Sequence, residues 1–535
     1  MNQTLRIFRK DARHHWPEIL LSLVLLILYC WKEVRDTDPE RFYSSVSIIP
    51  WLEFVPILLP VAWFLLIVRL VQGESLVGDR QWWVTKPYQW PSLLTAKFLS
   101  FLVWFYGPVF FAQCFVLRTA GFAVTPHLAG LFRSQFGPIS DMLAVCFLIA
   151  CLTRNLGHAI IALIGLFLLM TGFDSFERFQ PNRALEPIQS VSDMLSGIVA
   201  VTASLAVVLW QFARRKTVHT RSVFLAAFAA TWVIQLATPY HALMEKKYPV
   251  ASVQDQPFRM ALRSEPLGKP GNPPRKDPKD ILLRIPVEVS GISPGTFVTV
   301  DAQQLTVEDS TGAKWQEEWT FGGGQWWPED HSIWSMLSVK NSVYQKLKSQ
   351  PVRLRLEMAV SEYHLEDPRE FRVQEGEFRV TTLGICGTRG PLRTILTCRL
   401  PFVAPPFVAT FDPASAKCPM EPNKTPQGSP PLRSVNLRSF VAQSLVSPIA
   451  TSHINFVSYP PSLSPSNPPK SQTICPGDTI GLSTPVVIHH VRVEVLLEPV
   501  QMEKFRLVPD QPASTMTGWS VYSIPSVQLV IAIRI

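Results

Sequence analysis

Long apolar runs fill the first 240 residues and restrict the folds open to this part of the chain. They lie at residues 17–31, 51–71, 93–117, 138–153, 157–172, 192–212 and 222–240. A helix needs ~20 apolar residues to cross a bilayer, and lipid cannot satisfy unpaired backbone groups. Several runs are shorter, and the pair 138–153 and 157–172 also fits a helical hairpin that enters the membrane and returns. We expect an α-helical polytopic membrane domain over residues 17–240, with six to seven transmembrane helices.

Cations mark one end of these predicted spans. They occupy every second connection, at Arg6, Arg9, Lys10, Arg13, Arg80, Lys86, Lys97, Arg154, Arg214, Arg215, Lys216 and Arg221. Lys and Arg near span ends stay on the cytoplasmic side. The connection after the first run also holds cations, but acids accompany them. We therefore expect a multi-pass protein of the plasma or inner membrane, with a cytoplasmic amino terminus and an extracytoplasmic C-terminal domain.

The formal net charge of +9 raises nucleic acid as a partner. The cations of the membrane half sit at the ends of apolar runs, and the polar half has no basic stripe interleaved with aromatic residues. A groove for nucleic acid needs such a stripe. We expect no nucleic-acid partner.

Residues 1–16 carry a helical pattern before the first apolar run. Leu5, Phe8, Ala12 and Trp16 recur at helical spacing, and four cations lie between them. This pattern is typical of an amphipathic helix that lies on a membrane surface. A plain basic flank is the simpler alternative. We expect a cytoplasmic interfacial helix.

The predicted spans hold no charge near their centres. Their ionisable residues lie near the ends, at Glu53, Arg69, Arg118, Asp141, His158 and Asp193. A charge in the middle of a bilayer costs about 2.5–3.5 kcal/mol and is kept where function needs it, as in ion-coupled carriers. The chain also lacks the G-x-x-x-x-G-K-[ST] phosphate loop. If it transports a substrate, the ATPase is expected on a separate subunit.

The connection after the second run has an unusual composition. Residues 78–97 read GDRQWWVTKPYQWPSLLTAK. Trp82, Trp83, Tyr88 and Trp90 favour the headgroup layer. Pro87 and Pro91 interrupt regular helix, and Ser92 is a candidate cap for the next one. We expect a short helix, a break and re-entry into the membrane.

Two motifs resemble those of permease subunits of the ABC-2 class of ABC exporters. One is the interfacial Phe8-Arg9-Lys10-Asp11, and the other runs from Asp79 to Pro87. The resemblance covers roughly residues 4–215. It implies that the second motif docks on a separate ABC ATPase, through Asp79, Arg80, Trp82, Trp83, Thr85, Lys86 and Pro87. It also implies a homo- or heterodimer of permease subunits and no cofactor in this chain. Family permeases have six spans and end inside the cell, whereas this chain adds the run 222–240 and a large polar half.

The second half alternates apolar and polar residues. A Pro-rich linker is expected over 241–280, with its densest part at 265–280. The segments that begin at Ile281, Thr296, Val352 and Val491 alternate with period two, which marks half-buried strands. We expect an all-β, sandwich-like extracytoplasmic domain over residues 281–535, built as one unit or as two modules that meet near 380–400.

Cysteines divide between the two halves. Cys30, Cys114, Cys146 and Cys151 lie in the apolar runs and fit small apolar residues. The other four are Cys386, Cys398, Cys418 and Cys475. Outside the cytoplasm these can form disulfides, and Cys386 with Cys398 is the first choice among three possible sets of pairs. No C-x-x-C motif occurs, so we expect no metal site.

The remaining candidates for chemistry are weak. His489 and His490 are adjacent on a predicted strand and point to opposite faces, so they are poor co-ligands. The acidic pairs 317–318 and 366–367 are typical of solvated loops. Five tryptophans, at 315, 319, 326, 327 and 334, pack a core or form an exposed aromatic platform for a glycan or peptide. No nucleophile motif is present. We expect no enzymatic activity in this chain.

Two functions fit these observations. The leading hypothesis is a membrane-spanning permease subunit of an ABC-type, ABC-2-like transporter, energised by a separate ATPase subunit. The alternative is a membrane-anchored extracytoplasmic binding or sensory protein. An exported enzyme is a weaker third hypothesis, because it would need a hydrolytic site in the polar half.

Overall fold

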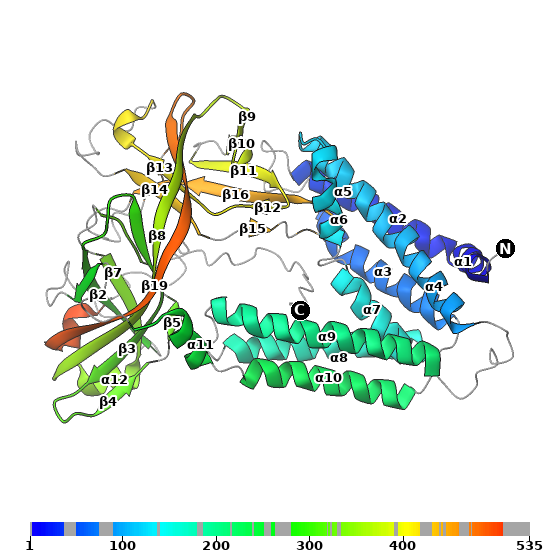
Figure 1. Cartoon of the computed structure of the whole chain (residues 1–535), viewed down its shortest axis with the longest axis horizontal. Coiled ribbons are helices and arrows are strands. Elements are labelled where there is room, and N and C mark those ends of the chain that lie inside the picture. Colours follow the sequence, from blue (N-terminus) through cyan, green and yellow to red (C-terminus); the bar gives the residue numbers. More distant parts are fainter. Residues whose placement is uncertain are drawn as a thin grey trace.

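The chain has a helical region and a β region (Figure 1). The computed structural model describes residues 3–36, 50–73, 89–135, 140–178, 186–214, 217–237, 240–250, 258–262, 280–317, 319–321, 324–328, 333–389, 394–417, 431–437, 440–441, 444, 446–458, 470–471 and 473–506. The helical region ends at Lys247, and the β region begins at Arg259. The division into a helical half and an antiparallel all-β half is as the sequence predicted.

Each predicted apolar run forms helix. The helices are α1 Gln3–His14, α2 Trp16–Asp36, η1 Pro50–Phe54, α3 Val55–Gln72, α4 Trp90–Phe101, η3 Leu102–Tyr106, α5 Gly107–Thr119, η4 Thr125–His127, α6 Leu128–Ser134, α7 Ser140–Leu152, α8 Leu156–Arg178, α9 Glu186–Arg214, α10 Thr217–Ala237 and α11 Tyr240–Lys247. Four stretches among the described residues are long and apolar enough to cross a membrane: Leu52–Gln72, Trp90–Thr119, Leu195–Ala213 and Thr217–Ile234. Shorter apolar helices cover Met142–Leu152 and Leu156–Leu169.

The third run forms one long helix with a π turn in its middle. α4, η3 and α5 follow without a break, and the Gly107 N–H bonds to the carbonyl of Leu102, five residues earlier. Pro108 explains the irregularity, because its ring would clash with the preceding turn of an α-helix. The helix begins at Trp90 with Gln89 as its N-cap and Pro91 in the first turn. The expected cap, Ser92, is therefore wrong, since it already lies inside the helix.

The expected linker over 241–280 is partly structured. α11 occupies its first residues, and strand β1 pairs with β2 from Arg259 to Leu262. Residues 263–279 lie outside the described residues. The Pro-rich composition of 265–280 therefore does not extend to the segments before it, where helix and strand form.

The β region contains two sandwiches that share two strands. Its elements are β1 Arg259–Leu262, β2 Asp280–Ser290, β3 Thr296–Glu308, β4 Lys314–Gln316, β5 Thr320–Phe321, β6 Gln325–Trp326, β7 Ile333–Lys340, α12 Asn341–Leu347, β8 Pro351–Arg372, β9 Glu377–Val380, β10 Gly384–Arg389, β11 Ile395–Pro401, β12 Val403–Ala404, β13 Phe407–Phe411, η7 Pro413–Ser415, β14 Leu432–Asn436, β15 Phe440–Val441, β16 Ile449–Asn455, β17 Val457–Ser458, β18 Lys470–Ser471, β19 Thr479–Gln501 and η8 Met502–Phe505. The largest sheet has the order β14-β13-β19-β8-β3-β4. Sheet β1-β2-β7 faces one part of it, and sheet β16-β11-β10-β9 faces another.

Period-two burial builds both cores. On β2, the side chains of Ile281, Leu283, Ile285 and Val287 are at most 2% exposed, and they pack with β3, β8 and β19. The second core joins β9, β10, β11 and β16 to β13 and the start of β19. β8 and β19 pair along nearly their whole length of 22 and 23 residues. The two modules therefore do not meet near 380–400, because residues 377–401 lie inside the second one and the shared strands join the two.

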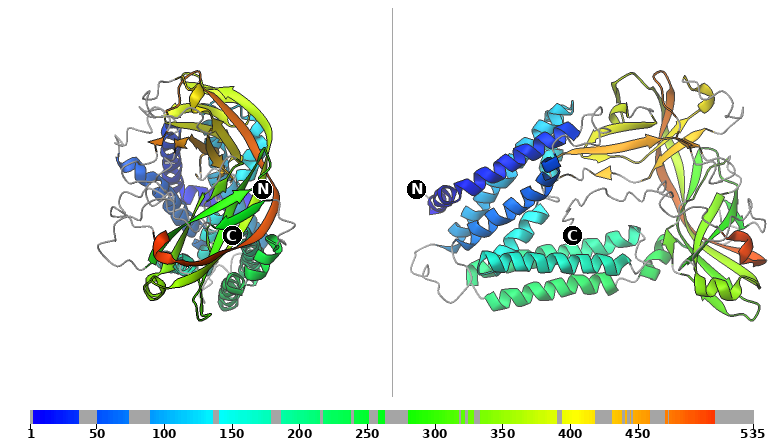
Figure 2. Two further views of the ribbon diagram at one scale, coloured as in Figure 1. Left: turned by 90° about the vertical axis from the view of Figure 1, so that its left-hand side faces the viewer. Right: turned by 180° about the vertical axis from the view of Figure 1, so that it is seen from behind.

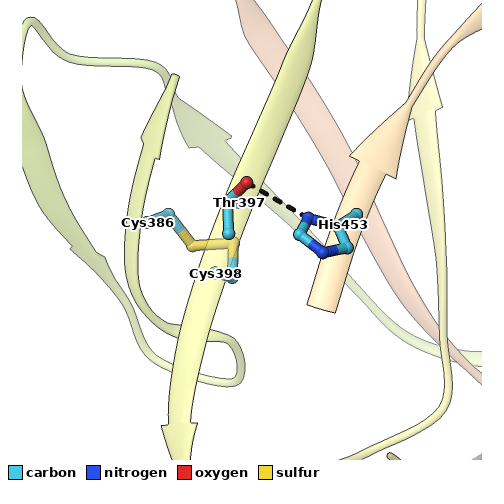
Figure 3. Close-up of a disulfide and its surroundings, with 4 residues drawn as sticks. All are labelled: Cys386, Thr397, Cys398 and His453. Carbon is cyan, nitrogen blue, oxygen red and sulfur yellow. Dashed lines mark hydrogen bonds between the residues drawn. A yellow bond between two sulfur atoms is a disulfide. The ribbon is translucent and has the colours of Figure 1, made fainter. Parts of the chain in front are cut away.

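A disulfide joins two neighbouring strands of the second core. Cys386 on β10 and Cys398 on β11 are directly opposite in the ladder, and a disulfide joins them (Figure 3). Both are fully buried. On the neighbouring pair of strands, Thr397 Oγ1 lies 3.2 Å from His453 Nδ1. Cys475 is also disulfide-bonded. Among the described cysteines, the thiols of Cys30, Cys114, Cys146 and Cys151 are free, and these lie in the helical region.

Replacing Cys386 and Cys398 together by Ala should destabilise the β region by about 3 kcal/mol, because the bond closes a short loop in the unfolded chain. Chemical denaturation of the full-length protein, followed by protease sensitivity of the β region, measures this. Cys114→Ala is the control, because that thiol is free. An unchanged unfolding midpoint for the double variant would show that the bond does not hold this core.

Candidate functional sites at the two ends of the helical region

The segment expected to dock on an ATPase lies outside the described residues. This applies to Asp79, Arg80, Trp82, Trp83, Thr85, Lys86 and Pro87. Its flanks are described: α3 ends at Gln72, and α4 begins at Trp90. The interactions around these two helix ends therefore define the surroundings of the candidate site.

A buried ion pair holds α1 beside the start of α4. Asp11 Oδ2 accepts a hydrogen bond from Lys97 Nζ at 2.6 Å, and the two side chains are 7% and 1% exposed. Phe8 stacks on Trp104 with ring centroids 6.1 Å apart, and Arg9 and Lys10 are exposed. Phe8 and Asp11, the first and last residues of the motif, thus face the protein. Arg9 and Lys10 between them face outward.

The predicted apolar face of α1 differs from the buried one. Leu5 and Trp16 are 49% and 60% exposed, and Trp16 belongs to α2. Ile7 and Asp11 form the face that is buried in the protein. Lys97 supplies the partner that lets the Asp11 carboxylate be buried. The face predicted to lie on the membrane stays a prediction.

Further polar contacts join the other helices at this same end. The Arg69 guanidinium of α3 pairs with Glu18 of α2. Gln72 Nε2 donates to Thr153 Oγ1, after α7, at 2.9 Å. Arg221 of α10 donates to the Leu152 carbonyl at 2.8 Å, and Thr220 donates to Gln211 of α9 at 2.7 Å. We call these groups, with Asp11 and Lys97, the polar layer. The polar layer contains the amino ends of α2, α4 and α10 and the carboxyl ends of α3, α7 and α9. The first three helices therefore run in the opposite direction to the other three.

The β region packs against the opposite helix ends. Near the carboxyl end of α2, Glu33 accepts a hydrogen bond from the Ser444 hydroxyl at 2.8 Å, and Ser444 Oγ lies 3.3 Å from Tyr29 Oη. After α5, Arg379 donates to the carbonyl of Gly121 at 2.7 Å. Val446 and Ile449 are buried in the apolar core of the helical region. The helical region therefore has two unlike ends, one with the polar layer and one with the β region.

Phe402 makes the tightest apolar contact between the two regions. Its backbone is left-handed, with φ of 63°, which is strained for a bulky residue. Its N–H donates to the Pro448 carbonyl at 2.6 Å, and its ring lies 6.1 Å from that of His127. A Cβ on Gly130 of α6 would lie 2.4 Å from the ring. Only glycine therefore leaves room for Phe402, and we call this contact the Phe402 joint.

A buried hydrogen-bond network attaches the end of α11 to the large sheet. Tyr248 Oη donates to Asp301 Oδ2 at 2.7 Å, and the Ser361 hydroxyl donates to the same oxygen. Ser361 Oγ lies 2.7 Å from His490 Nδ1. We call these four residues the Tyr248 network. The Arg492 N–H also donates to the Pro249 carbonyl at 2.9 Å.

The Tyr248 network is not a nucleophilic triad. In such a triad the histidine lies between the serine and the carboxylate. Here Ser361 lies between Asp301 and His490, and it is fully buried. The arrangement can fix side chains and move a proton locally, but it does not present an activated hydroxyl to a substrate.

Burial sets the charge states around this network. Desolvation lowers the pKa of His490 below its ordinary value, and the nearby Lys247 ammonium lowers it further, against the opposing charge of Asp301. Desolvation also raises the pKa of Tyr248, and the Asp301 carboxylate adds to this effect. His490 is therefore neutral in the folded protein at neutral pH.

The adjacent histidines have different partners, as strand alternation predicts. His489 Nδ1 lies 3.1 Å from Glu362 Oε2 on one side of the ladder, whereas His490 belongs to the Tyr248 network. Among the described residues, no group of three or more His, Cys, Asp or Glu side chains is placed to hold a metal ion. Glu317 accepts a backbone N–H from Lys340 at 3.3 Å, and Glu366 and Asp367 are exposed.

The tryptophans pack the core of the β region. Trp319, Trp326 and Trp327 are at most 6% exposed, so they form no exposed platform. Trp327 stacks on Phe297 at 4.4 Å, and the Arg433 guanidinium lies 4.1 Å from the Trp327 ring centroid. Trp315 is partly exposed beside Lys346, and the side chain of Trp334 is outside the described part of the structure.

Comparisons with known proteins add no family. No family model matches the chain, and no curated protein matches it. A solved structure of red sea bream transglutaminase matches over 48% of this chain with 8% identity and a TM-score of 0.11. The match spans 31% of that enzyme. Similarity at this level carries no argument about fold or function.

Asp11→Ala should destabilise the protein by about 3–5 kcal/mol, because it leaves the Lys97 ammonium buried without its carboxylate partner. Thermal unfolding of the purified protein in detergent measures this. The double variant Asp11→Leu, Lys97→Met should recover most of the loss, since it removes both charges. Arg9→Ala is the exposed control. If the double variant were destabilised by the sum of the losses from the two single substitutions, a direct pair would be contradicted.

Stability should fall as the pH drops below about 6.5, because the unfolded chain then binds a proton at His490 before the folded protein does. The charged groups that face His490 are Asp301 of the sheet and Lys247 of α11. The free energy of unfolding of the wild type and of His490→Gln, compared from pH 7.5 to about 5, tests this. The difference in free energy of unfolding between the two proteins should shrink at low pH. A pH-independent difference would refute the assignment.

Proposed function

We propose that this chain is the membrane-spanning permease subunit of an ABC-type, ABC-2-like transporter, energised by a separate ATPase. One observation carries the proposal: the β region binds the helical region at the ends of α2, α5, α6 and α11. An external domain that needs only an anchor requires a single tether. Contacts to several helices favour a function in which the helices themselves act.

In the proposed topology, the polar layer faces the cytoplasm. Arg6, Arg9 and Arg13 on α1 are exposed at this end, as expected for the cytoplasmic side. The disulfide between Cys386 and Cys398 requires an oxidising compartment, which supports an extracytoplasmic β region. α2, α3, the Trp90–Thr119 helix, α7, α8, α9 and α10 then cross the membrane in alternating directions. Seven crossings would put the amino terminus and the β region on opposite sides of the membrane.

The helix ends that flank the proposed ATPase contact belong to the polar layer or lie beside it. Residues 79–87 connect α3 to α4, and Lys97 on α4 is paired with Asp11 on α1. A force on the connection would therefore reach α1 as well as the third span. ATP hydrolysis belongs to the partner, and two permease subunits, identical or different, would complete the transporter.

A binding or sensory protein is the second candidate. The Tyr248 network favours it, because it links the last helix directly to the centre of the large sheet. A ligand bound by the β region would thereby influence the membrane helices without any ATPase. The two candidates differ in whether a nucleotide-binding partner exists.

Affinity purification of the tagged full-length protein from gently crosslinked membranes tests the proposal. The wild type should retain a nucleotide-binding subunit, and the variant Trp82→Ala, Trp83→Ala, Lys86→Ala should lose most of it. Trp31→Ala is the matched control, because that exposed tryptophan lies near the opposite end of α2. Recovery of no nucleotide-binding protein with the wild type would favour the binding or sensory function.

A further inference from the structure

We propose that the β region is a strap that fixes the separation between two groups of helices, and that the Phe402 joint is its releasable end. The first helix group is α2, α5 and α6, and the second is α9, α10 and α11. The inference does not depend on an ATPase or on transport. It follows from where the β region is attached and from the unequal nature of the two attachments.

The two helix groups are joined through other helices, among them α4, which continues into α5 and also packs on α9. α2 packs on α5 and α3, α3 packs on α7, and α7 packs on α9. The groups diverge toward the β region, where one meets the second sandwich and the other meets the first (Figures 1 and 2). Within the described part of the chain, the strap therefore connects them at this end.

A single strand pair, interrupted by register shifts such as that between Val487 and His489, runs from one attachment of the strap to the other. β8 and β19 pair from Pro351 with Gln501 to Arg372 with Thr479, and both sandwiches pack on this pair. The Tyr248 network uses Ser361 and His490, which are partners in this ladder. The Phe402 joint follows β11, in the sandwich at the other part of the ladder. A change in spacing between the helix groups must therefore bend paired strands or release one attachment.

The attachment at α11 is the permanent one. The chain itself runs from α10 through α11 to Tyr248, whose hydroxyl is bound by Asp301. Met244 and Tyr248 are buried with Ala302, Trp319 and Ala359. Breaking this end would leave the buried Ser361 without its Asp301 partner and expose an apolar cluster, which is costly.

The attachment at Phe402 is built to release. It is not continuous with the helices it touches, and it stores backbone strain at a non-glycine residue with positive φ. The ring occupies the space left by Gly130. Polar contacts from Ser444 to Glu33 and from Arg379 to Gly121 lie nearby, and Val446 and Ile449 pack beside them in the helical core. Water can replace those polar bonds, and release of the ring relaxes Phe402. The two helix groups then separate or approach while the β region stays folded.

Distance measurement between spin labels on the full-length protein in lipid nanodiscs tests the strap. Labels at Thr125, before α6, and at Lys246, on α11, report on the two groups, and both side chains are exposed. Attachment through unnatural amino acids leaves the native cysteines and the disulfide intact. The wild type should give one narrow distance distribution.

Phe402→Ala and Phe402→Gly should both broaden and shift the distribution, because each removes the ring. Gly130→Ala should do the same with Phe402 present, since the added Cβ displaces the ring. This milder variant keeps the test decisive if a Phe402 variant fails to fold. Val403→Ala, at the exposed neighbouring residue, is the matched control and should leave the distribution unchanged. An unchanged distribution in folded Phe402 and Gly130 variants, or equal broadening with Val403→Ala, would overturn the proposal.

Discussion

The structure depends on one constraint: the helical region carries large apolar side chains that no other part of the described chain covers. Phe111, Ile161 and Val218 on the helices are 72%, 70% and 74% exposed, whereas most large apolar side chains on the strands of the β region pack in its cores. Water would penalise such helices by about 1.5–3 kcal/mol for each large side chain. In the proposed membrane topology, lipid removes that cost, and it also requires that backbone groups be satisfied within each helix. The two halves would then face different solvents, which accounts for their different composition and fold.

The same constraint places polar chemistry at the helix ends. Asp11 with Lys97 and Glu18 with Arg69 are ion pairs near one end, and the other end meets a folded domain through aromatic, hydroxyl and backbone contacts. A buried pair such as Asp11 and Lys97 specifies one arrangement, because either charge alone would be costly. Phe402 and Gly130 act by shape instead. The two ends thus use different interactions to fix the same helices.

Local patterns explain how much the sequence revealed. Apolar runs located every long helix of the helical region, and alternation located β2, β3, β8 and β19. Cys386 with Cys398 was the first choice among three sets of pairs, and the structure has this bond. What escaped prediction depends on partners far along the chain. Asp11 is buried because of Lys97, Ser361 because of Asp301 and His490, and Gly130 is needed because of Phe402. The sequence allowed two modules but did not indicate that they share strands, since the strands of the shared ladder lie more than 100 residues apart.

Side-specific labelling of single introduced cysteines tests the central arrangement most directly. Arg9→Cys lies on the exposed face of α1, and Lys314→Cys lies on exposed β4. With any outer envelope opened and the inner membrane intact, a membrane-impermeant maleimide should label Lys314→Cys at once. Arg9→Cys should react only after the membrane is permeabilised. Labelling of both cysteines from the same side, or of Arg9→Cys alone in intact cells, would contradict a helical region whose two ends face different compartments.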